Sequence, residues 1–325
     1  MGAWRFAALP LAVAGLIAVA APALAQGKYP SRPIRIVHPF APGSVSDVTL
    51  RILSDKLGPR LGTTIVIDNQ PRAGGTTAAA AALSSARDGY TLVTFSTSTA
   101  ISASLFNSLP YDPVADFVPV SGISTFANII AVNESSKHRT LGDFIAAARA
   151  TPGKLNFGTT TVGSTNHLAV TLFKSMSGLD FVIVPFRTPG DLLTGVLRND
   201  VDAIIQSYGA LKSALEGKQI RALGSTTPTR ASYAPDVPTV DEAGIKGFDV
   251  VTWNGIFAPT DTPPEVIETL NREVQAVLAD PELKKRYADL GLEPLPVGPA
   301  ALGGLLKNEV RKWGRVIGEA GIEKQ

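Results

Sequence analysis

The sequence predicts an α/β fold of two successive units with a ligand cleft between them, followed by helices that return to the first unit. Short apolar runs alternate with helical patterns from residue 34 onward, which is the βαβ rhythm of a parallel sheet. The same rhythm recurs later in the chain, and amphipathic helices follow it. Of the 325 residues, 45% are apolar and 18% are charged, a balance typical of a folded chain rather than a disordered one.

The elements follow from short apolar runs and from apolar residues at helical spacing. In the first unit we expect strands at 34–37, 64–67 and 91–95, and helices at 45–61 and 76–86. In the second unit we expect strands at 155–158, 181–184, 203–205 and 220–223, and helices at 166–176 and 191–198. Amphipathic helices are expected at 264–278, 281–290 and 299–317, each opened by a proline that suits the first helical turn.

No low-complexity linker separates the two units, so the chain is expected to cross between domains more than once. The predicted division assigns residues 26–126 and 252–325 to domain 1, with the C-terminal helices packing back on it. Residues 127–251 form the predicted domain 2. A cleft between two α/β lobes is where small ligands usually bind.

The first 25 residues are predicted to be a secretory signal peptide. One cation, Arg5, precedes a charge-free stretch that closes on the small-residue pattern Ala23-Leu24-Ala25, with cleavage expected before Gln26. A transmembrane anchor is the alternative, because the uncharged stretch is long enough to span a bilayer. Two prolines and a high alanine content weigh against an anchor, so the mature chain is expected to be exported.

Several classes of protein and site are disfavoured by composition. A formal net charge of +2 does not suit a nucleic-acid binder, and the absence of cysteine excludes disulfides, thiolate metal sites and cysteine nucleophiles. Three histidines, far apart in the sequence, leave little material for a metal site. No dinucleotide or phosphate-loop motif is present, nor a serine-hydrolase elbow or a zinc-protease motif. We therefore expect no cofactor, no metal and no catalytic turnover.

A repeated arrangement of strand, short Gly/Ser/Thr loop and helix is the positive signal. It occurs at 42–46, 73–77, 96–99 and 159–165. Each loop places free backbone N–H groups at a helix N-terminus, which carries a partial positive charge and binds carboxylates. Ordinary helix capping is the alternative for any single loop, since Ser and Thr are common N-caps and Ser44-x-x-Asp47 fits a capping box. Four such loops in two lobes favour a shared anion site.

Individual side chains near these loops leave both interpretations open. For Asp47, a role as the capping partner of Ser44 is favoured over ligand contact, because a carboxylate repels an acidic ligand. For Phe40, a position in the cleft wall and a position in the core are equally consistent with the sequence. Arg187 follows a strand and would pair with a carboxylate if it faces the cleft, or would be a solvated surface residue. For His167, a structural role is favoured over ligand contact.

The run Tyr29-Pro30-Ser31-Arg32-Pro33-Ile34-Arg35-Ile36-Val37, followed by Pro39-Phe40-Ala41-Pro42-Gly43, resembles the Bug family. These are TctC-like solute-binding proteins of tripartite tricarboxylate transporters. Further matches are Asp88-Gly89-Tyr90-Thr91-Leu92, Leu109-Pro110-Tyr111-Asp112-Pro113, Pro235-Asp236-Val237-Pro238-Thr239 and Trp253-Asn254-Gly255. The resemblance covers essentially the whole chain after the signal segment.

The resemblance implies a periplasmic-binding-protein-like, type II-like architecture that holds a small carboxylate between two domains. It also implies delivery to the permease subunits of a tripartite tricarboxylate transporter in the membrane. Taken with the loop analysis, it gives the following candidate ligand-binding residues: Phe40, Ala41, Gly43, Ser44, Asp47, Ser96, Thr97, Ser98, Thr99, Thr159, Thr160, Thr161, Ser164, Thr165, His167 and Arg187.

Three departures from the family pattern bear on the ligand. The first loop reads Pro42-Gly43-Ser44 where the family usually has Pro-Gly-Gly. A second loop reads Pro185-Phe186-Arg187-Thr188-Pro189 where Pro-Tyr-Lys/Arg-Gly is common, and His38 replaces a commonly apolar residue. Transfer of a particular ligand from the family is therefore not justified by the sequence.

The sequence thus predicts a monomeric, exported carboxylate receptor in the periplasm with a small-molecule ligand, a membrane permease as partner and no nucleic acid. Two other classes remain as alternatives. One is a sensory partner that presents its ligand state to a signalling protein, which needs the same cleft. The other is an exported hydrolase that uses a serine with His167.

Overall fold

The computed structural model describes residues 29–72 and 75–325. The predicted signal peptide, residues 1–25, lies outside the described residues, as do Ala73 and Gly74 of the second glycine loop. Among the helices of the described ranges, none combines the length and the apolar character needed to cross a bilayer.

The elements fall into three runs along the chain. The first run comprises β1 (Ile34–His38), α1 (Val45–Leu61), β2 (Ile65–Asn69), α2 (Thr76–Leu83), β3 (Thr91–Ser96) and α3 (Thr97–Leu105). The long strand β4 (Phe117–Asn133) leads to α4 (Leu141–Ala150), β5 (Asn156–Thr159), α5 (Thr165–Ser177), β6 (Val182–Pro185), α6 (Pro189–Leu197), β7 (Ala203–Ser207), α7 (Tyr208–Glu216) and β8 (Ile220–Ser225). The last run is β9 (Val251–Pro259), α8 (Pro264–Leu278), α9 (Pro281–Asp289), β10 (Glu293–Pro294) and α10 (Pro299–Glu319).

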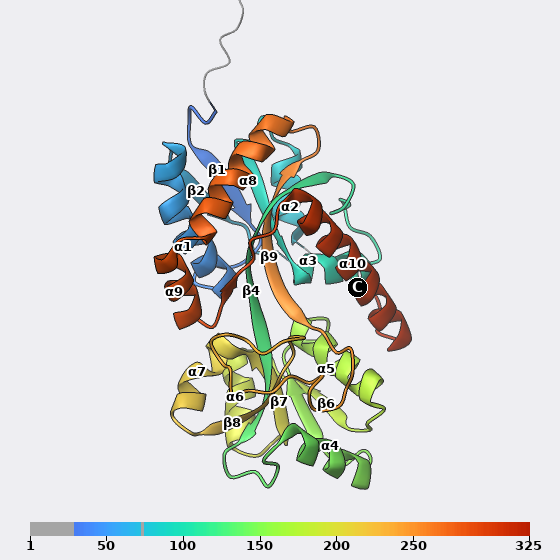
Figure 1. The fold of residues 1–325 in the computed structure, drawn as a ribbon. Helices are drawn as coiled ribbons and strands as arrows, with labels where there is room; N and C mark the ends of the chain where they lie inside the picture. The colour runs from blue at the N-terminus through green and yellow to red at the C-terminus, as the bar shows by residue number, and fades with distance from the viewer. Residues whose placement is uncertain (1–28, 73–74) are drawn as a thin grey trace, which may run out of the picture.

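These elements form an upper and a lower part in Figure 1, joined along β4 and β9. The upper part holds β1 to α3 and α8 to α10, and the lower part holds α4 to β8. The described strands hydrogen-bond in the order β2-β1-β3-β9-β4-β7-β5-β6, with β8 and β10 also paired to β4. Two parallel groups, β2-β1-β3 and β6-β5-β7, are therefore linked by the antiparallel strands β4 and β9.

The strand β4 brings the carboxyl ends of both parallel groups to the middle of the molecule. Ser96 at the end of β3 pairs with Asn254, which pairs with Ser124 of β4, and Ser207 at the end of β7 pairs with Asn128 of β4. Ser124 and Asn128 lie four residues apart on β4, which corresponds to about 13 Å along the strand. The loops that leave β3 and β7 therefore open toward each other.

The sequence reasoning predicted most elements of both parallel groups within a few residues, and the α1 and α8 bounds agree fully. It did not predict β4, because Pro119, Ser121, Gly122 and Ser124 resemble a loop more than a strand. Register shifts in β4 opposite β9 absorb these residues. Its neighbour β9 was also missed, and both strands are identified mainly by their long-range pairing.

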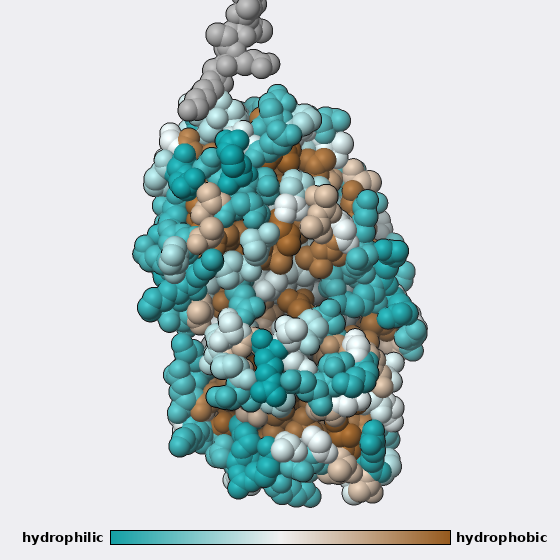
Figure 2. Space-filling view, in the orientation of Figure 1, coloured by the Kyte–Doolittle hydropathy of each residue, from teal (hydrophilic) through white to brown (hydrophobic). Residues whose placement is uncertain are grey.

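Packing in the upper part buries apolar faces of α1, α8 and α9 against the sheet, with Leu53, Leu270 and Tyr287 in one cluster. A second and larger cluster runs through both parts and includes Phe95, Phe157 and Trp313. The helix α10 packs on α3 and β4 and reaches α5 of the lower part. Figure 2 shows polar residues over most of the visible face, with apolar residues gathered in patches.

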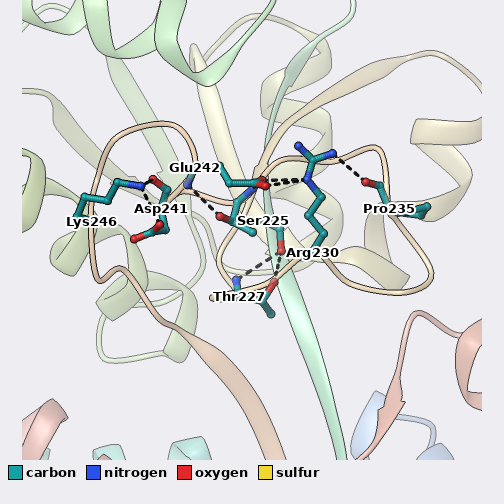
Figure 3. Close-up of polar contacts among 8 residues, drawn as sticks. Ser225, Thr227, Arg230, Pro235, Asp241, Glu242 and Lys246 are labelled. Atoms are coloured by element: carbon teal, nitrogen blue, oxygen red, sulfur yellow. Dashed lines mark hydrogen bonds and ion pairs between the residues drawn. The ribbon is translucent and has the colours of Figure 1, made fainter.

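A braced loop carries the chain from β8 back to β9, and it contains part of the sequence that resembles the Bug family. Arg230 donates from Nε to both carboxylate oxygens of Glu242, which also accepts from the backbone N–H of Thr239 (Figure 3). Lys246 pairs with Asp241 in the same loop. These contacts hold the loop in the conformation that leads the chain into β9. The run from Pro235 to Thr239 therefore has a structural role.

We expect Gly122→Ala to destabilise the protein by about 1–3 kcal/mol, the usual cost of overpacking a core. A Cβ on Gly122 would lie 2.4 Å from the carbonyl oxygen of Leu295 and 2.8 Å from a methyl carbon of Val297. Urea unfolding measures the change in the free energy of unfolding. As a control, Gly304→Ala lies in the exposed face of α10 with nothing within 4 Å, and it should be neutral or stabilising. Equal stability of the two variants would contradict the assigned register of β4.

Candidate functional site

A small cleft lies where the two sets of strand ends meet, with a cavity volume of about 250 Å³. We call it the cleft, and it is defined by its lining residues: Phe40, Ser46, Ser96, Ser98, Phe126, Asn128, Thr160, Ser164, Thr165, Asn166, Gln206, Ser207, Thr252 and Asn254. Loops from the upper part, loops from the lower part and the linking strands all contribute. Both apolar rings and many neutral hydrogen-bonding groups are thus available to a ligand.

Helix N-termini, rather than cationic side chains, supply partial positive charge at the cleft. No lining side chain among the described residues is ionisable, yet α1, α3, α5 and α7 all begin at the cleft. Each helix N-terminus carries about half a positive charge and several backbone N–H groups without an intrahelical partner. Such an arrangement stabilises a small anion, because the dipoles are fixed by the fold before the ligand arrives.

Serine and threonine side chains at these termini serve as caps and also line the cleft. Ser96 caps α3, accepting from the backbone N–H of Ser98 at 3.2 Å, while its own N–H donates to Thr99 Oγ1 at 3.2 Å. Ser164 caps α5, accepting from the backbone N–H of His167 at 3.2 Å, and it pairs with Thr160 at 2.9 Å. Capping and ligand access are therefore compatible at the same residues.

The buried carboxylate of Asp47 fixes the shape of the first loop. It accepts hydrogen bonds from the backbone N–H of Gly43 at 2.8 Å, from Arg51 at 2.9 and 3.0 Å, and from Asn69 at 2.8 Å. Burial raises its pKa, but the hydrogen bonds from Arg51, Gly43 and Asn69 outweigh burial and hold the pKa at about 2. Asn69 also donates to the carbonyl oxygen of Phe40 at 3.0 Å. Asp47 thus braces the loop that presents Phe40.

The capping of α1 differs from a full capping box. Ser44 Oγ accepts from the backbone N–H of Asp47 at 3.3 Å, as expected for the N-cap. The carboxylate of Asp47 reaches back to the N–H of Gly43 rather than to that of Ser44. Gly43 has φ of +80°, where a side chain would be strained, so the loop needs glycine at this position.

Polar side chains on the linking strands tie the cleft together. Ser46 Oγ donates to Asn254 Oδ1, and Asn254 Nδ2 donates to Ser124 Oγ at 3.2 Å. Asn128 Nδ2 lies 3.4 Å from Thr252 Oγ1. The floor of the cleft is therefore a hydrogen-bonded layer between the start of α1 and the strands β4 and β9.

The structure brings only some of the candidate residues to the cleft. Those that line it are Phe40, Ser96, Ser98, Thr160, Ser164 and Thr165. Ala41 and Thr99 line an adjoining hollow of about 410 Å³, which Phe40 and Ser98 share. The candidates Gly43, Ser44, Asp47, Thr97, Thr159 and Thr161 are not among the residues that line the cleft.

Two of the charged or aromatic candidates lie apart from the cleft. Arg187 is exposed at the start of the loop before α6. His167 lines a separate hollow of about 670 Å³ between α5 and α10. Burial lowers the pKa of His167, and its Nδ1 accepts from the backbone N–H of Gly163 at 3.4 Å. Within the described part of the chain, no hydrogen bond joins this ring to a serine hydroxyl, so the hydrolase alternative gains no support.

Sequence reasoning missed cleft residues on the linking strands, at the end of β7 and in the first turns of α1 and α5. The missed residues are Ser46, Phe126, Asn128, Asn166, Gln206, Ser207, Thr252 and Asn254. A signal existed for Gln206 and Ser207, because they directly follow the predicted strand 203–205, as Ser96 directly follows the predicted strand 91–95. The linking-strand residues carry no local signal, since only the pairing of β4 with β9 places them.

A larger hollow of about 760 Å³ lies in the upper part, between the start of β4, α8 and α10. Apolar residues such as Phe117, Ile267 and Leu306 line it, and Figure 2 shows apolar residues gathered in this region. Two helices, α8 and α10, begin at this hollow, but each begins with a proline, which has no backbone N–H to donate, and all of its lining comes from the upper part. We therefore assign the candidate site to the smaller cavity.

His38, the last residue of β1, packs against Phe40 of the first loop. Its side chain is 1% exposed, its Nδ1 lies 2.6 Å from Thr94 Oγ1, and its ring lies 5.2 Å from the ring of Phe40. Burial lowers the pKa of His38 to about 4, with smaller and opposing effects from Asp47 and Arg51. The neutral imidazole is therefore the form that the folded protein holds near neutral pH.

We expect Asp47→Asn to lower the free energy of unfolding by about 1–3 kcal/mol, because the carboxylate loses charge-assisted hydrogen bonds in a buried position. Urea unfolding followed by circular dichroism measures the loss. The matched control is Asp180→Asn, which removes an exposed ion pair with Lys174 and should change stability by less than about 0.5 kcal/mol. A stable Asp47→Asn variant that no longer binds acids would instead make Asp47 a direct ligand contact.

Protonation of His38 should destabilise the fold as the pH falls. The pKa of His38 is depressed from 6.5 to about 4 in the folded state, so its contribution is complete above pH 6.5 and declines down to about pH 4. We expect the stability advantage of the wild type over His38→Gln to shrink by up to about 3 kcal/mol across this range. Urea unfolding of both proteins at several pH values measures it. A pH-independent difference would show that His38 is not held neutral.

Comparison with known proteins identifies the family and the fold. A family model described as the tripartite tricarboxylate transporter family receptor matches residues 49–322. Protein BugT of Bordetella pertussis is 33% identical over 319 residues, covering 96% of this chain and 98% of BugT. The solved structure of R. palustris Rpa4515 with adipate has a TM-score of 0.78 at 30% identity and covers 91% of this chain and 100% of that chain.

A second solved structure, MatC from Rhodopseudomonas palustris with bound malate, has a TM-score of 0.73 at 30% identity and covers 89% of this chain and 100% of that one. These likenesses confirm the predicted α/β binding-protein architecture and the resemblance stated from the sequence. The chain therefore belongs to the Bug family, the TctC-like receptors of tripartite tricarboxylate transporters.

Proposed function

We propose that this protein is a periplasmic receptor that captures a small carboxylate in the cleft and delivers it to a tripartite tricarboxylate-type permease. The observation that carries the proposal is the convergence of α1, α3, α5 and α7 on a small cavity lined by neutral side chains. Adipate and malate in the related solved structures support a carboxylate as the ligand class.

The proposed mechanism is capture by domain closure without chemistry. Domain 1 comprises residues 26–126 and 252–325, and domain 2 comprises residues 127–251. A ligand that contacts both domains binds the closed arrangement more tightly than the open one and so shifts the population toward it. The permease then recognises the closed monomer. Residues 1–25 direct export as a cleaved signal peptide, and neither a cofactor nor a metal takes part.

A sensory role, in which the closed form contacts a signalling protein, uses the same cleft and the same ligand. Uptake of the ligand by cells that lack this protein separates the two roles. Loss of uptake supports transport, whereas normal uptake with a lost transcriptional response supports sensing.

Thermal unfolding against mono-, di- and tricarboxylates and aromatic acids tests the binding function. An acid at a hundredfold excess over its dissociation constant should add about 2.7 kcal/mol to the free energy of unfolding and raise the midpoint by several degrees. A panel in which no acid moves the midpoint would overturn the proposal.

A charge placed in the cleft should abolish this stabilisation. Ser98 is half-buried and lines the cleft, so the carboxylate of Ser98→Asp would repel an acidic ligand. We expect the midpoint of this variant to stay unchanged by the acid that stabilises the wild type. The matched control, Ser213→Asp on an exposed position of α7, should keep the full ligand-induced shift. The same loss in both variants would show that binding responds to net charge rather than to the cleft.

A further inference from the structure

We propose that Gln206 determines specificity at the lower wall of the cleft, where its amide nitrogen donates to a second carboxylate and so selects a dicarboxylate. The inference rests on the proposed function and names the ligand class within it. It also assigns a ligand contact to a residue that the loop pattern of the sequence did not point to.

The orientation of the Gln206 amide follows from its neighbours. Its Oε1 accepts from the backbone N–H of Ser207 at 2.8 Å and from Asn166 Nδ2 at 3.1 Å. A backbone N–H can only donate, so the oxygen of the amide must face Ser207. The nitrogen Nε2 is therefore fixed on the other side of the amide group.

That nitrogen has no hydrogen-bond partner within the described structure, although the side chain is only 7% exposed and lines the cleft. A buried donor left without an acceptor is unfavourable. An acceptor atom supplied by the ligand removes this penalty, so Nε2 favours a ligand oxygen as its partner.

The start of α7 makes a charged oxygen the best acceptor. This helix begins at Tyr208, directly after Gln206 and Ser207, and Ser207 makes no side-chain capping bond to it. The positive end of the helix dipole and the Gln206 amide thus act on the same small volume. A carboxylate satisfies both, whereas a hydroxyl or an amide oxygen carries too little charge to use the helix terminus fully.

The upper wall holds the other end of the ligand. The starts of α1 and α3 face the cleft from the upper part. On β4, Ser124 at the upper side and Asn128 at the lower side are about 13 Å apart along the strand. A short dicarboxylate can therefore contact both walls. Among the described residues that line the cleft, none has an acidic side chain to pair with an ammonium group. The carboxylate of Asp47 is fully used by its own partners, so an amino acid is disfavoured.

Isothermal titration calorimetry with matched ligands tests this assignment. The probes are α,ω-dicarboxylates of four to six carbons, the corresponding half-amides, and aspartate. For the wild type we expect the best diacid to bind at least about tenfold more tightly than its half-amide, since a hydrogen bond to a charged group is lost. Aspartate should bind more weakly than succinate.

Gln206→Glu keeps the length of the side chain but replaces the donor by a negatively charged acceptor. We expect it to lose at least about tenfold in affinity for the diacid and to prefer the half-amide, whose N–H groups can donate to the new carboxylate. Gln206→Met, which removes the donor without adding charge, should bind diacid and half-amide with similar affinity. Gln219→Glu makes the same chemical change at an exposed position before β8 and should retain the wild-type profile.

The outcomes separate this proposal from the proposed function. A wild type that binds diacid and half-amide equally, or a Gln206→Glu variant with an unchanged profile, overturns the role of Gln206 and leaves carboxylate capture intact. Absence of binding to every acid overturns the proposed function, and this assignment fails with it.

Discussion

The candidate site depends on the placement of helix N-termini by two linking strands. Because β4 pairs with β9 on one side and with β7 on the other, the ends of parallel strands from both parts of the molecule meet at its middle. Each strand end continues into a helix, so backbone N–H groups and dipoles converge there without an ionised side chain. The partial positive charge of a helix N-terminus belongs to the backbone, so it does not depend on the protonation of a side chain.

Binding by uncharged groups would suit the proposed function, in which the protein must also release its ligand. A buried arginine would hold a carboxylate strongly but would leave an unpaired buried charge once the ligand departs. Helix termini and hydroxyl groups return to solvent or to their caps at little cost, as the paired Thr160 and Ser164 illustrate. The charged residues near the cleft are used differently: Asp47 and Arg51 pair with each other and hold the first loop in shape. In the proposed site, affinity would come from the helix dipoles, whereas the ion pair of Asp47 with Arg51 holds the loop in shape.

Most of the fold could be predicted from local pattern, and about half of the cleft could not. Short apolar runs between helical patterns identified the parallel groups, because their strands are short and bounded by turn residues. The inner strands β1, β3, β5 and β7 are also mostly buried. The loops after β1, β3 and β5 were recognised because glycine, serine and threonine precede helices there. Asn128, Thr252 and Asn254 were missed because they lie on strands that local sequence does not mark and that become a cleft wall only through long-range pairing. For Asp47, the sequence predicted a role in capping but not the hydrogen bonds that its carboxylate accepts from Arg51 and Asn69.

Backbone amide NMR during titration with a small dicarboxylate tests the central claim most directly. If helix N-termini hold the ligand, the largest shift changes should fall on amides of residues 43–46, 96–99, 160–166 and 206–209. Perturbations that cluster instead in the apolar hollow between α8 and α10, or that leave these four segments unmoved while the ligand binds, would contradict the account.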